Sequence, residues 1–278
     1  LKLDAAELWR VHRQLTHTLL SLIREEARRT FVRRTREASQ LASSGVLLDP
    51  DALTIGFARR FATYKRANLV FYDVERLLRI VTDQARPLQI VFSGKAHPAD
   101  TPGKHVLQEV YQTTRDPRFE GRIAFVEDYD MHIAHVMVQG VDLWLNVPRV
   151  PMEASGTSGM KAALNGVPQL STADGWWAEG YNGHNGWTNA TPAVEEDSRE
   201  ANAKAAEELY NLLEQEVVPT FYQRDPSGLP RQWIGMMKQA MRVAGLQFMA
   251  RRMLIEYVRN SYMPAIAGDN VPDAPPTA

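Results

Sequence analysis

The spacing of hydrophobic residues changes near residue 50 and divides the chain into two parts. Before that point, apolar side chains recur three or four positions apart between Leu8 and Ile23, the spacing of one face of a helix. Residues 4–40 are therefore predicted to form one long helix, with a second half so charged that only a narrow face can be buried. Residues 43–50 are predicted to be a linker.

Beyond the linker, short apolar runs alternate with amphipathic segments. Strands are predicted at 53–58, 88–93, 122–128, 141–147 and 167–172, and helices at about 67–83, 103–114, 131–139 and 157–164. Strands that are apolar throughout and separated by helices are typical of a parallel sheet covered on both faces. The prediction is an α/β domain with a doubly wound parallel sheet, whose ligands bind at the carboxyl ends of the strands.

The rest of the chain is predicted to be helical. Asp197 and Ser198 can cap a helix that runs to about residue 218, and two more helices are expected near 230–244 and 247–262. Their core face is predicted to consist of Met236, Met237, Met241, Phe248, Met249 and Met253. A tail rich in Pro and Ala, 263–278, is predicted to be disordered. The expected division is therefore 1–50, 51–262 and 263–278.

Composition narrows the classes of partner. The 278 residues are 44% hydrophobic and 23% charged, as in ordinary globular proteins. A net charge of -1 gives no general attraction to nucleic acid or to a membrane surface, and no apolar run is long enough to span a bilayer. The absence of cysteine excludes disulfides and cysteine nucleophiles, and it suits a reducing compartment. The first residues, LKLDAAELWR, carry no initiator Met, so the chain is expected to be cut from a longer one.

The segment MEASGTSGMKAALNG (152–166) carries the strongest chemical signal. Small residues at 156–159 begin a predicted helix, and the N–H groups of a helix start can bind an anion. Lys161 follows in the first turns, where the positive helix end disfavours its ammonium form, and partial burial would act in the same direction. A neutral amine is what a Schiff-base lysine needs. The alternative is an ordinary helix cap with a surface lysine, since small-residue helix starts are common.

The segment FARRFATYKRAN (57–68) places four cations within eight residues after the first strand. These are Arg59, Arg60, Lys65 and Arg66. Cations that converge on one place bind phosphate or another oxyanion well. The alternative is a solvated helix face.

Three other segments carry weaker signals. The Lys95 and His97 loop is too short for a nucleotide-binding P-loop, and its role is as readily structural as functional. Tyr129 could hydrogen-bond a ligand, whereas Asp130 is expected to cap the next helix. The segment 174–187 has three Trp and four Gly, which suit either sugar faces or packing against another domain.

A metal site is not expected at the pair of histidines that follows Asp130. His132 and His135 lie three positions apart on a predicted helix, but no third ligand is near them in the sequence.

Together these segments resemble the glycogen and maltodextrin phosphorylase family, in particular the C-terminal portion of its bacterial branch. The matching stretches are EASGTSGMKAALNG, ARRFATYKRAN, SGKAHP, EDYD and DGWWAEGYNGHNGW, spread over roughly 51–262. The resemblance implies one half of a two-Rossmann-domain glycosyltransferase fold. It also implies phosphorolysis of α-1,4-glucans by inorganic phosphate to glucose 1-phosphate, with pyridoxal 5′-phosphate as cofactor.

The resemblance further implies roles for individual residues. Lys161 would carry pyridoxal phosphate as a Schiff base, Arg60 would bind inorganic phosphate, and Lys65 would bridge the two phosphates. The remaining cofactor contacts would be Arg59, Tyr129, Gly156, Thr157 and Ser158. The sugar hydroxyls would be held by Glu153, Ser155 and Gly156. Arg59 stands where muscle-type enzymes carry a lysine.

Length is the main departure from the family. Its members have an N-terminal domain that supplies the other wall of the cleft, and nothing here resembles it. The chain is therefore expected to be inactive alone, and to belong to a cytoplasmic enzyme that is a homodimer at full length. In the family the last helix crosses back to the missing domain, so the helix at 247–262 is predicted to leave an apolar strip exposed.

Two other functional classes stay open on the residues alone. A nucleotide-sugar glycosyltransferase on a similar fold would need no lysine at position 161. A non-catalytic carbohydrate-binding or oligomerisation fragment would not bind the cofactor even with the N-terminal half supplied.

Overall fold

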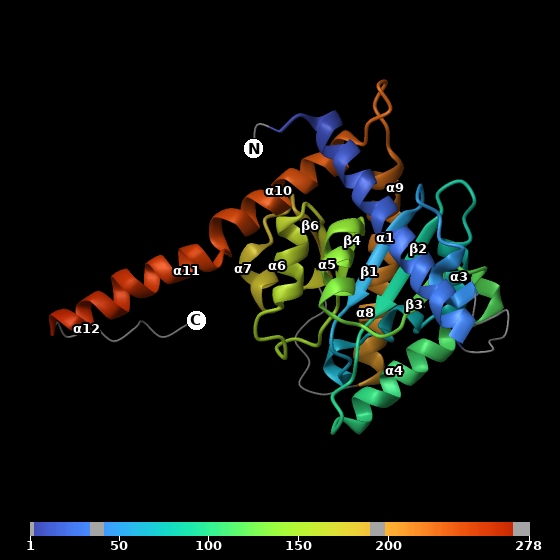
Figure 1. The fold of residues 1–278 in the computed structure, drawn as a ribbon, viewed down its shortest axis with the longest axis horizontal. Coiled ribbons are helices and arrows are strands. Elements are labelled where there is room, and N and C mark those ends of the chain that lie inside the picture. The colour runs from blue at the N-terminus through green and yellow to red at the C-terminus, as the bar shows by residue number, and fades with distance from the viewer. Residues whose placement is uncertain (1–2, 34–41, 190–197, 269–278) are drawn as a thin grey trace.

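A six-stranded parallel sheet forms the centre of the molecule. The computed structural model describes residues 3–33, 42–189 and 198–268. The strands are β1 (Leu53–Ala58), β2 (Leu88–Ser93), β3 (Ile123–Val126), β4 (Leu143–Asn146), β5 (Gln169–Thr172) and β6 (Gly186–Asn189). Their order is β3-β2-β1-β4-β5-β6, and every neighbouring pair is parallel (Figure 1). The predicted doubly wound parallel sheet is confirmed.

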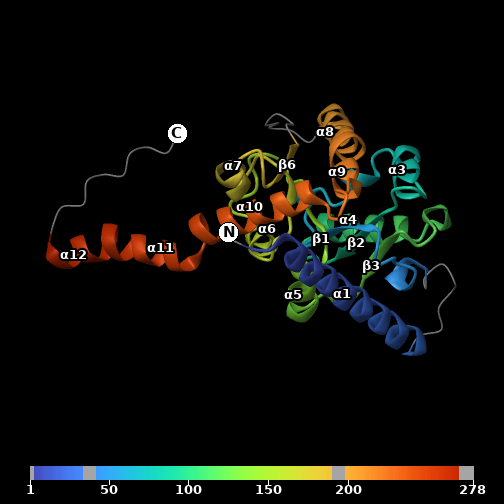
Figure 2. The same cartoon turned by 90° about the horizontal axis from the view of Figure 1, so that it is seen from above.

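Helices cover both faces of the sheet. The helices of the described residues are α1 (Ala5–Arg33), α3 (Val74–Val81), α4 (Thr101–Thr113), α5 (Met131–Gly140), α6 (Thr157–Leu164), α7 (Trp176–Gly180), α8 (Arg199–Leu212), α9 (Val218–Tyr222), α10 (Arg231–Gln247), α11 (Ala250–Tyr257) and α12 (Met263–Ala267), of which α11 and α12 project away from the sheet. Figure 2 shows α1 and α5 on one side of the sheet and α3 and α8 on the other. Short 3₁₀ turns occur at Thr63–Lys65, Leu69–Phe71 and Pro117–Phe119, and π-helical turns at Ala42–Val46, Leu213–Val217 and Val258–Tyr262.

The strands are apolar throughout because both of their faces are buried. Along β1, the side chains of Ile55 and Phe57 join the core under α3 and α8, whereas Ala58 joins the core under α1 and α5. All three are at most 1% exposed. Complete burial of a side chain the size of Ile or Phe contributes about 1.5–3 kcal/mol.

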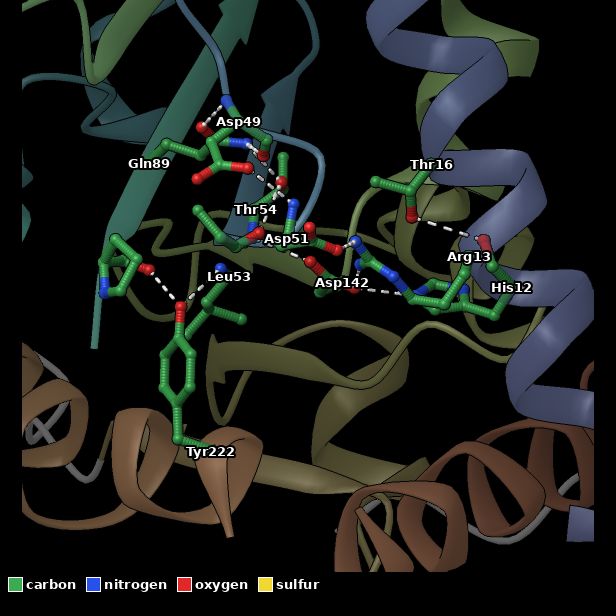
Figure 3. A network of polar contacts seen from close by, with 12 residues as sticks. His12, Arg13, Thr16, Asp49, Asp51, Leu53, Thr54, Gln89, Asp142 and Tyr222 are labelled. Carbon is green, nitrogen blue, oxygen red and sulfur yellow. Dashed lines mark hydrogen bonds and ion pairs between the residues drawn. The ribbon is translucent and has the colours of Figure 1, made fainter. Parts of the chain in front are cut away.

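A buried polar network fixes α1 to the amino ends of β1 and β4 (Figure 3). His12 Nε2 lies 2.7 Å from Asp142 Oδ1, and Asp142 Oδ2 accepts a hydrogen bond of 2.8 Å from the backbone N–H of Thr54. Neither His12 nor Asp142 is exposed by more than 2%. One carboxylate therefore joins the long helix to two central strands, at the edge opposite to the predicted site.

Some element boundaries differ from the prediction. The helix expected at 67–83 is a 3₁₀ turn followed by α3, because the Asp73 side chain accepts a hydrogen bond from Arg76 N and starts a new helix. The segment expected to be a linker begins with a π-helical turn at Ala42–Val46. Ser198 caps α8 as expected, whereas Asp197 and residues 34–40 lie outside the described residues.

The tryptophans of segment 174–187 are core residues, which corrects both interpretations made from the sequence. Trp176, Trp177 and Trp187 are 2%, 1% and 6% exposed. The first two pack against α6 and α10, including Ala163 and Phe248. They are therefore open neither to a sugar nor to another domain. The same segment ends in the sixth strand, β6, which the sequence analysis missed.

Helices α11 and α12, with the π-helical turn between them, form an arm (Ala250–Ala267) that leaves the body of the molecule in both views (Figures 1 and 2). Met237 is buried in the core as predicted, but Met249 and Met253 are more than 40% exposed, so their core assignment is wrong. No residue of α11 is buried against the described part of the chain, which confirms the predicted exposed apolar strip. The start of the predicted tail is helical (α12), and 269–278 lie outside the described residues.

No helix in the described part of the chain combines the length and the apolar character needed to cross a membrane.

Candidate functional site

The predicted site loops meet at the carboxyl edge of the sheet. Strands β1 and β4 are neighbours at the centre, and the chain continues from β1 towards β2 and β3 but from β4 towards β5 and β6. Such a switch point opens a crevice for ligands. Because all strands are parallel, the loops after β1, β2, β3 and β4 lie at one edge. Arg60 and Lys161 therefore share that edge, as predicted.

A buried ion-pair cluster joins the loops after β1 and β4. The Glu153 carboxylate accepts from Arg59 Nη2 at 2.6 Å and from Lys65 Nζ at 2.7 and 2.5 Å. All three side chains are less than a tenth exposed. Lys65 Nζ also lies 4.5 Å from the centre of the Tyr64 ring, a cation–π contact. Two residues with predicted phosphate contacts and one with a predicted sugar contact thus form one cluster.

Burial makes the charged form of the Arg59 side chain less favourable. Loss of water lowers the pKa of the Arg59 guanidinium, and the Glu153 carboxylate opposes this shift. Its Nε and Nη1 atoms are buried and have no hydrogen-bond partner among the described residues. Buried guanidinium donors without a partner are costly, and an anion at this place would satisfy them.

Arg66, one of the four cations in this segment, does not belong to the cation cluster. Its Nε and Nη2 donate to the backbone carbonyls of Val147 and Pro148, at 2.8 and 3.2 Å. The backbone N–H of Arg149 donates to the Tyr64 carbonyl at 2.7 Å. These bonds tie the loop that carries Lys65 to the loop that follows β4, which places Lys65 next to Glu153. Arg60, unlike its neighbours, is exposed.

The Lys95 loop supports the Arg59 loop through its backbone. Phe61 N donates to the Lys95 carbonyl at 2.9 Å, and Arg59 N donates to Ser93 O at 3.3 Å. A Cβ on Gly94 would lie 2.1 Å from the Arg59 carbonyl, so this approach requires glycine. The side chains of Lys95 and His97 are exposed. These contacts support a structural role for the loop, rather than a direct role of Lys95 or His97 in the site.

Helix α6 begins at Gly156, and no side chain in the described residues caps it. The N–H groups of its first turn are therefore free of a side-chain acceptor, as the expected anion seat requires. Thr157 is exposed and Ser158 is half-buried. The backbone carbonyl of Ser155 accepts a hydrogen bond from the backbone N–H of Trp176, in α7, at 2.8 Å.

Lys161 lines a cavity of about 400 Å³ beside this helix start. The other lining residues are Ala58, Tyr129, Met131, Ala134, His135, Val138, Trp144, Ser158 and Asn165. The Lys161 side chain is exposed. Burial raises the pKa of the Tyr129 hydroxyl above its ordinary value, and the nearby Arg59 guanidinium opposes this shift.

Two residues of this region escaped the sequence analysis. Trp144 lies inside β4 and looks like any core residue in the sequence, yet it lines the cavity, and its buried Nε1 has no partner among the described residues. Asp174 follows β5 and accepts from Glu153 N at 2.8 Å, which fixes the backbone of the cluster's only acid. Its position directly after a strand, before Gly175, was the available signal. Asp130 caps α5 through Ile133 N, as predicted.

Comparison with known proteins agrees with this geometry. The family described as carbohydrate phosphorylase matches residues 11–180, more than half of the chain. The chain belongs to the carbohydrate phosphorylase family. It is 52% identical over 256 residues to the glycogen phosphorylase of Aquifex aeolicus, covering 92% of this chain and 37% of that protein.

Other relatives extend the likeness within the family. The maltodextrin phosphorylase of Thermococcus litoralis is 46% identical over 94% of this chain and 30% of its own length. The glycogen phosphorylase of Mycobacterium bovis is 42% identical over 95% and 31%. This phosphorylase-family chain therefore spans about a third of the length of the curated relatives it matches.

Proposed function

We propose that the chain is the cofactor- and phosphate-binding part of an α-glucan phosphorylase. The observation that carries the proposal is that the Lys161 cavity and the buried Arg59–Glu153–Lys65 cluster lie at the same carboxyl edge of the sheet, at its switch point; Ala58, which precedes Arg59, lines the cavity. Relatives named glycogen phosphorylase and maltodextrin phosphorylase support a phosphorylase acting on glucans. The family resemblance adds the reaction: phosphorolysis of α-1,4-glucans to glucose 1-phosphate.

The residues fit pyridoxal 5′-phosphate as the cofactor. The group needs an accessible amine for its aldehyde and donors for its phosphate. Lys161 supplies an exposed amine at the cavity, and the helix start at Gly156, with Thr157 and Ser158, supplies uncapped N–H groups. Arg59 adds two unpartnered buried donors. When bound, the cofactor would supply a phosphate group that exchanges a proton with inorganic phosphate.

The chain's own residues would orient and stabilise the reacting phosphates. Arg60 is exposed beside Arg59 and would bind inorganic phosphate, while Lys65 would lie between the two phosphates. Two phosphate groups in contact repel unless cations surround them, and such fixed cations are most effective where water is excluded. The Tyr129 hydroxyl, which lines the cavity, would donate a hydrogen bond at the cofactor. Glu153 and Ser155 would hold sugar hydroxyls.

The remaining two thirds of the relatives' length would supply the other wall of the cleft. The Lys161 side chain is exposed here, and an open site gives water access to the reacting sugar. We therefore expect the chain to be inactive alone and to gain activity when the N-terminal part is supplied. A cytoplasmic location and a homodimer at full length stay expectations of the family resemblance.

The first test is attachment of the cofactor. The chain, supplied with its N-terminal part, is incubated with pyridoxal phosphate, reduced with borohydride and mapped by peptide mass spectrometry. We expect the pyridoxyl group on Lys161 and the absorbance of a bound imine before reduction. Lys161→Arg keeps the charge but cannot form an imine, so it should abolish the covalent adduct.

Lys95→Arg is the matched control, since Lys95 is an exposed lysine at the same edge of the sheet. It should leave the labelling of Lys161 unchanged. Labelling of Lys65, Lys95 or any other lysine would overturn the assignment. A flat absorbance spectrum with no adduct would favour a nucleotide-sugar glycosyltransferase instead.

A further inference from the structure

The Glu153 carboxylate occupies the donors that a phosphate would use. Both of its oxygens contact Lys65 Nζ, at 2.7 and 2.5 Å, and one contacts Arg59 Nη2 at 2.6 Å. A phosphate oxygen accepts hydrogen bonds from the same donors with the same geometry. Carboxylate and phosphate cannot fill these positions together.

Burial turns this overlap into competition. The side chains of Arg59, Lys65 and Glu153 are each less than a tenth exposed, so water screens their charges little. Two cations and one carboxylate leave the cluster with a single positive charge. A phosphate dianion added to it gives a net negative charge in a buried place, unless the carboxylate moves away.

The local structure leaves room for that movement. The backbone of Glu153 is held by Asp174, so the loop need not shift. Gly156 lies beside the side chain: a Cβ there would be 3.7 Å from Glu153 Cγ and 3.8 Å from Cδ. Because residue 156 is glycine, no side chain occupies this position next to the carboxylate. Meanwhile Nε and Nη1 of Arg59 are buried donors without a partner among the described residues, which a bound phosphate would satisfy.

We propose that Glu153 is a built-in counter-anion of the Arg59 and Lys65 cluster, displaced when a phosphate binds. This inference rests on the proposed function in one respect only: that the anion which binds here is a phosphate. Before phosphate enters, the carboxylate neutralises one of the two buried positive charges and weakens the binding of anions. After it is displaced, the carboxylate is free to accept hydrogen bonds from a sugar. Phosphate binding thereby prepares the sugar site.

The test is a calorimetric titration of inorganic phosphate into the chain purified without pyridoxal phosphate. Glu153→Gln keeps the size of the side chain and removes its charge. We expect phosphate to bind this variant about tenfold more tightly than the original chain. Without phosphate the variant should melt at a lower temperature, because two buried cations lose their partner, and phosphate should restore the melting temperature.

Glu214→Gln is the matched control. Glu214 pairs with Arg76 at 2.5 Å, away from the site, and its loss should leave phosphate affinity unchanged. Equal or weaker phosphate binding by Glu153→Gln would overturn the proposal. If Glu153→Gln does not fold, Glu153→Asp replaces it, because the shorter side chain cannot reach both cations. This variant should also bind phosphate more tightly than the original chain. Equal or weaker binding would overturn the proposal. Labelling of Lys161 is scored separately, so failure of the cofactor assignment leaves this result unaffected.

Discussion

Gly159 shows how one residue sets the position of the lysine two residues later. A Cβ at this position would lie 1.9 Å from Gln169 Oε1 and 2.8 Å from Trp176 Nε1. Gln169 and Trp176 are both at most 2% exposed, so neither can move freely. Only glycine lets the first turn of α6 lie this close to β5 and α7, and this turn positions Lys161.

Gly159→Ala is therefore expected to destabilise the chain by about 1–3 kcal/mol, the usual cost of overpacking. Gly235→Ala is the control: Gly235 lies within α10, and a Cβ there meets nothing within 4 Å. It should be neutral or stabilising by up to about 1 kcal/mol. Urea unfolding followed by circular dichroism measures both. Equal free energies of unfolding for the two variants would mean that α6 is not held by this contact.

The cation cluster marks the limit of residue-level prediction from sequence. The cationic side chains after β1 could be predicted to lie at the site, because a loop after a parallel strand reaches the carboxyl edge. Their partner could not, since Glu153 is 94 positions from Arg59 and only the folded loops bring them together. The same holds for Arg66, whose carbonyl partners lie more than 80 positions away.

At the scale of elements, prediction succeeded where one periodic signal dominated. Helix α6 spans Thr157–Leu164, as expected, because small residues precede a run of good helix formers. Strand β6 was missed since it has four residues and follows a loop rich in Gly. Its place beside β5 is set by pairing, for example Gly186 with Gln169, and not by a hydrophobic pattern of its own.

The attachment of α1 to the sheet leads to a prediction about Asp142. Asp142→Ala removes the partner of His12 and of the Thr54 N–H, all of which stay buried (Figure 3). We expect a loss of about 3 kcal/mol in the free energy of unfolding, since a buried group left unpaired keeps its desolvation cost. Thermal and urea unfolding measure the loss.

Asp51→Ala supplies the comparison for the same chemical change. Asp51 contacts Arg13 at 3.3 Å, but its side chain is 88% exposed. Exposed ion pairs contribute little, so the change should stay within about 0.5 kcal/mol. If the Asp142 and Asp51 variants lose equal stability, the network does not hold α1 in place.

At the scale of the whole molecule, the body buries its apolar residues, whereas the arm exposes them. The sheet and its covering helices bury two continuous apolar cores, one on each face. The arm carries apolar residues every four positions, at Leu254, Val258, Tyr262 and Ile266, and each is at least 39% exposed. Exposed apolar rows of this kind usually mark a surface for a partner. The partner that we propose for this row is the N-terminal domain expected from the family resemblance.

This contrast predicts that removal of the arm leaves the body intact. A chain ending at Met249 loses α11 and α12, in which no residue is buried against the described part of the chain. Its free energy of unfolding should change by less than about 0.5 kcal/mol. Binding of a dye that fluoresces on exposed apolar surface should fall, because the row from Leu254 to Ile266 is gone.

A matched variant separates loss of the arm from loss of core. Trp233→Ala, in α10, truncates a side chain that is 0% exposed and should cost about 3–5 kcal/mol in the free energy of unfolding.

Addition of the N-terminal part should protect the arm of the full chain, but not that of Leu254→Glu, from hydrogen exchange. If truncation at Met249 instead destabilises the body, the arm packs on the domain that carries it. The apolar row would then need no second domain to cover it.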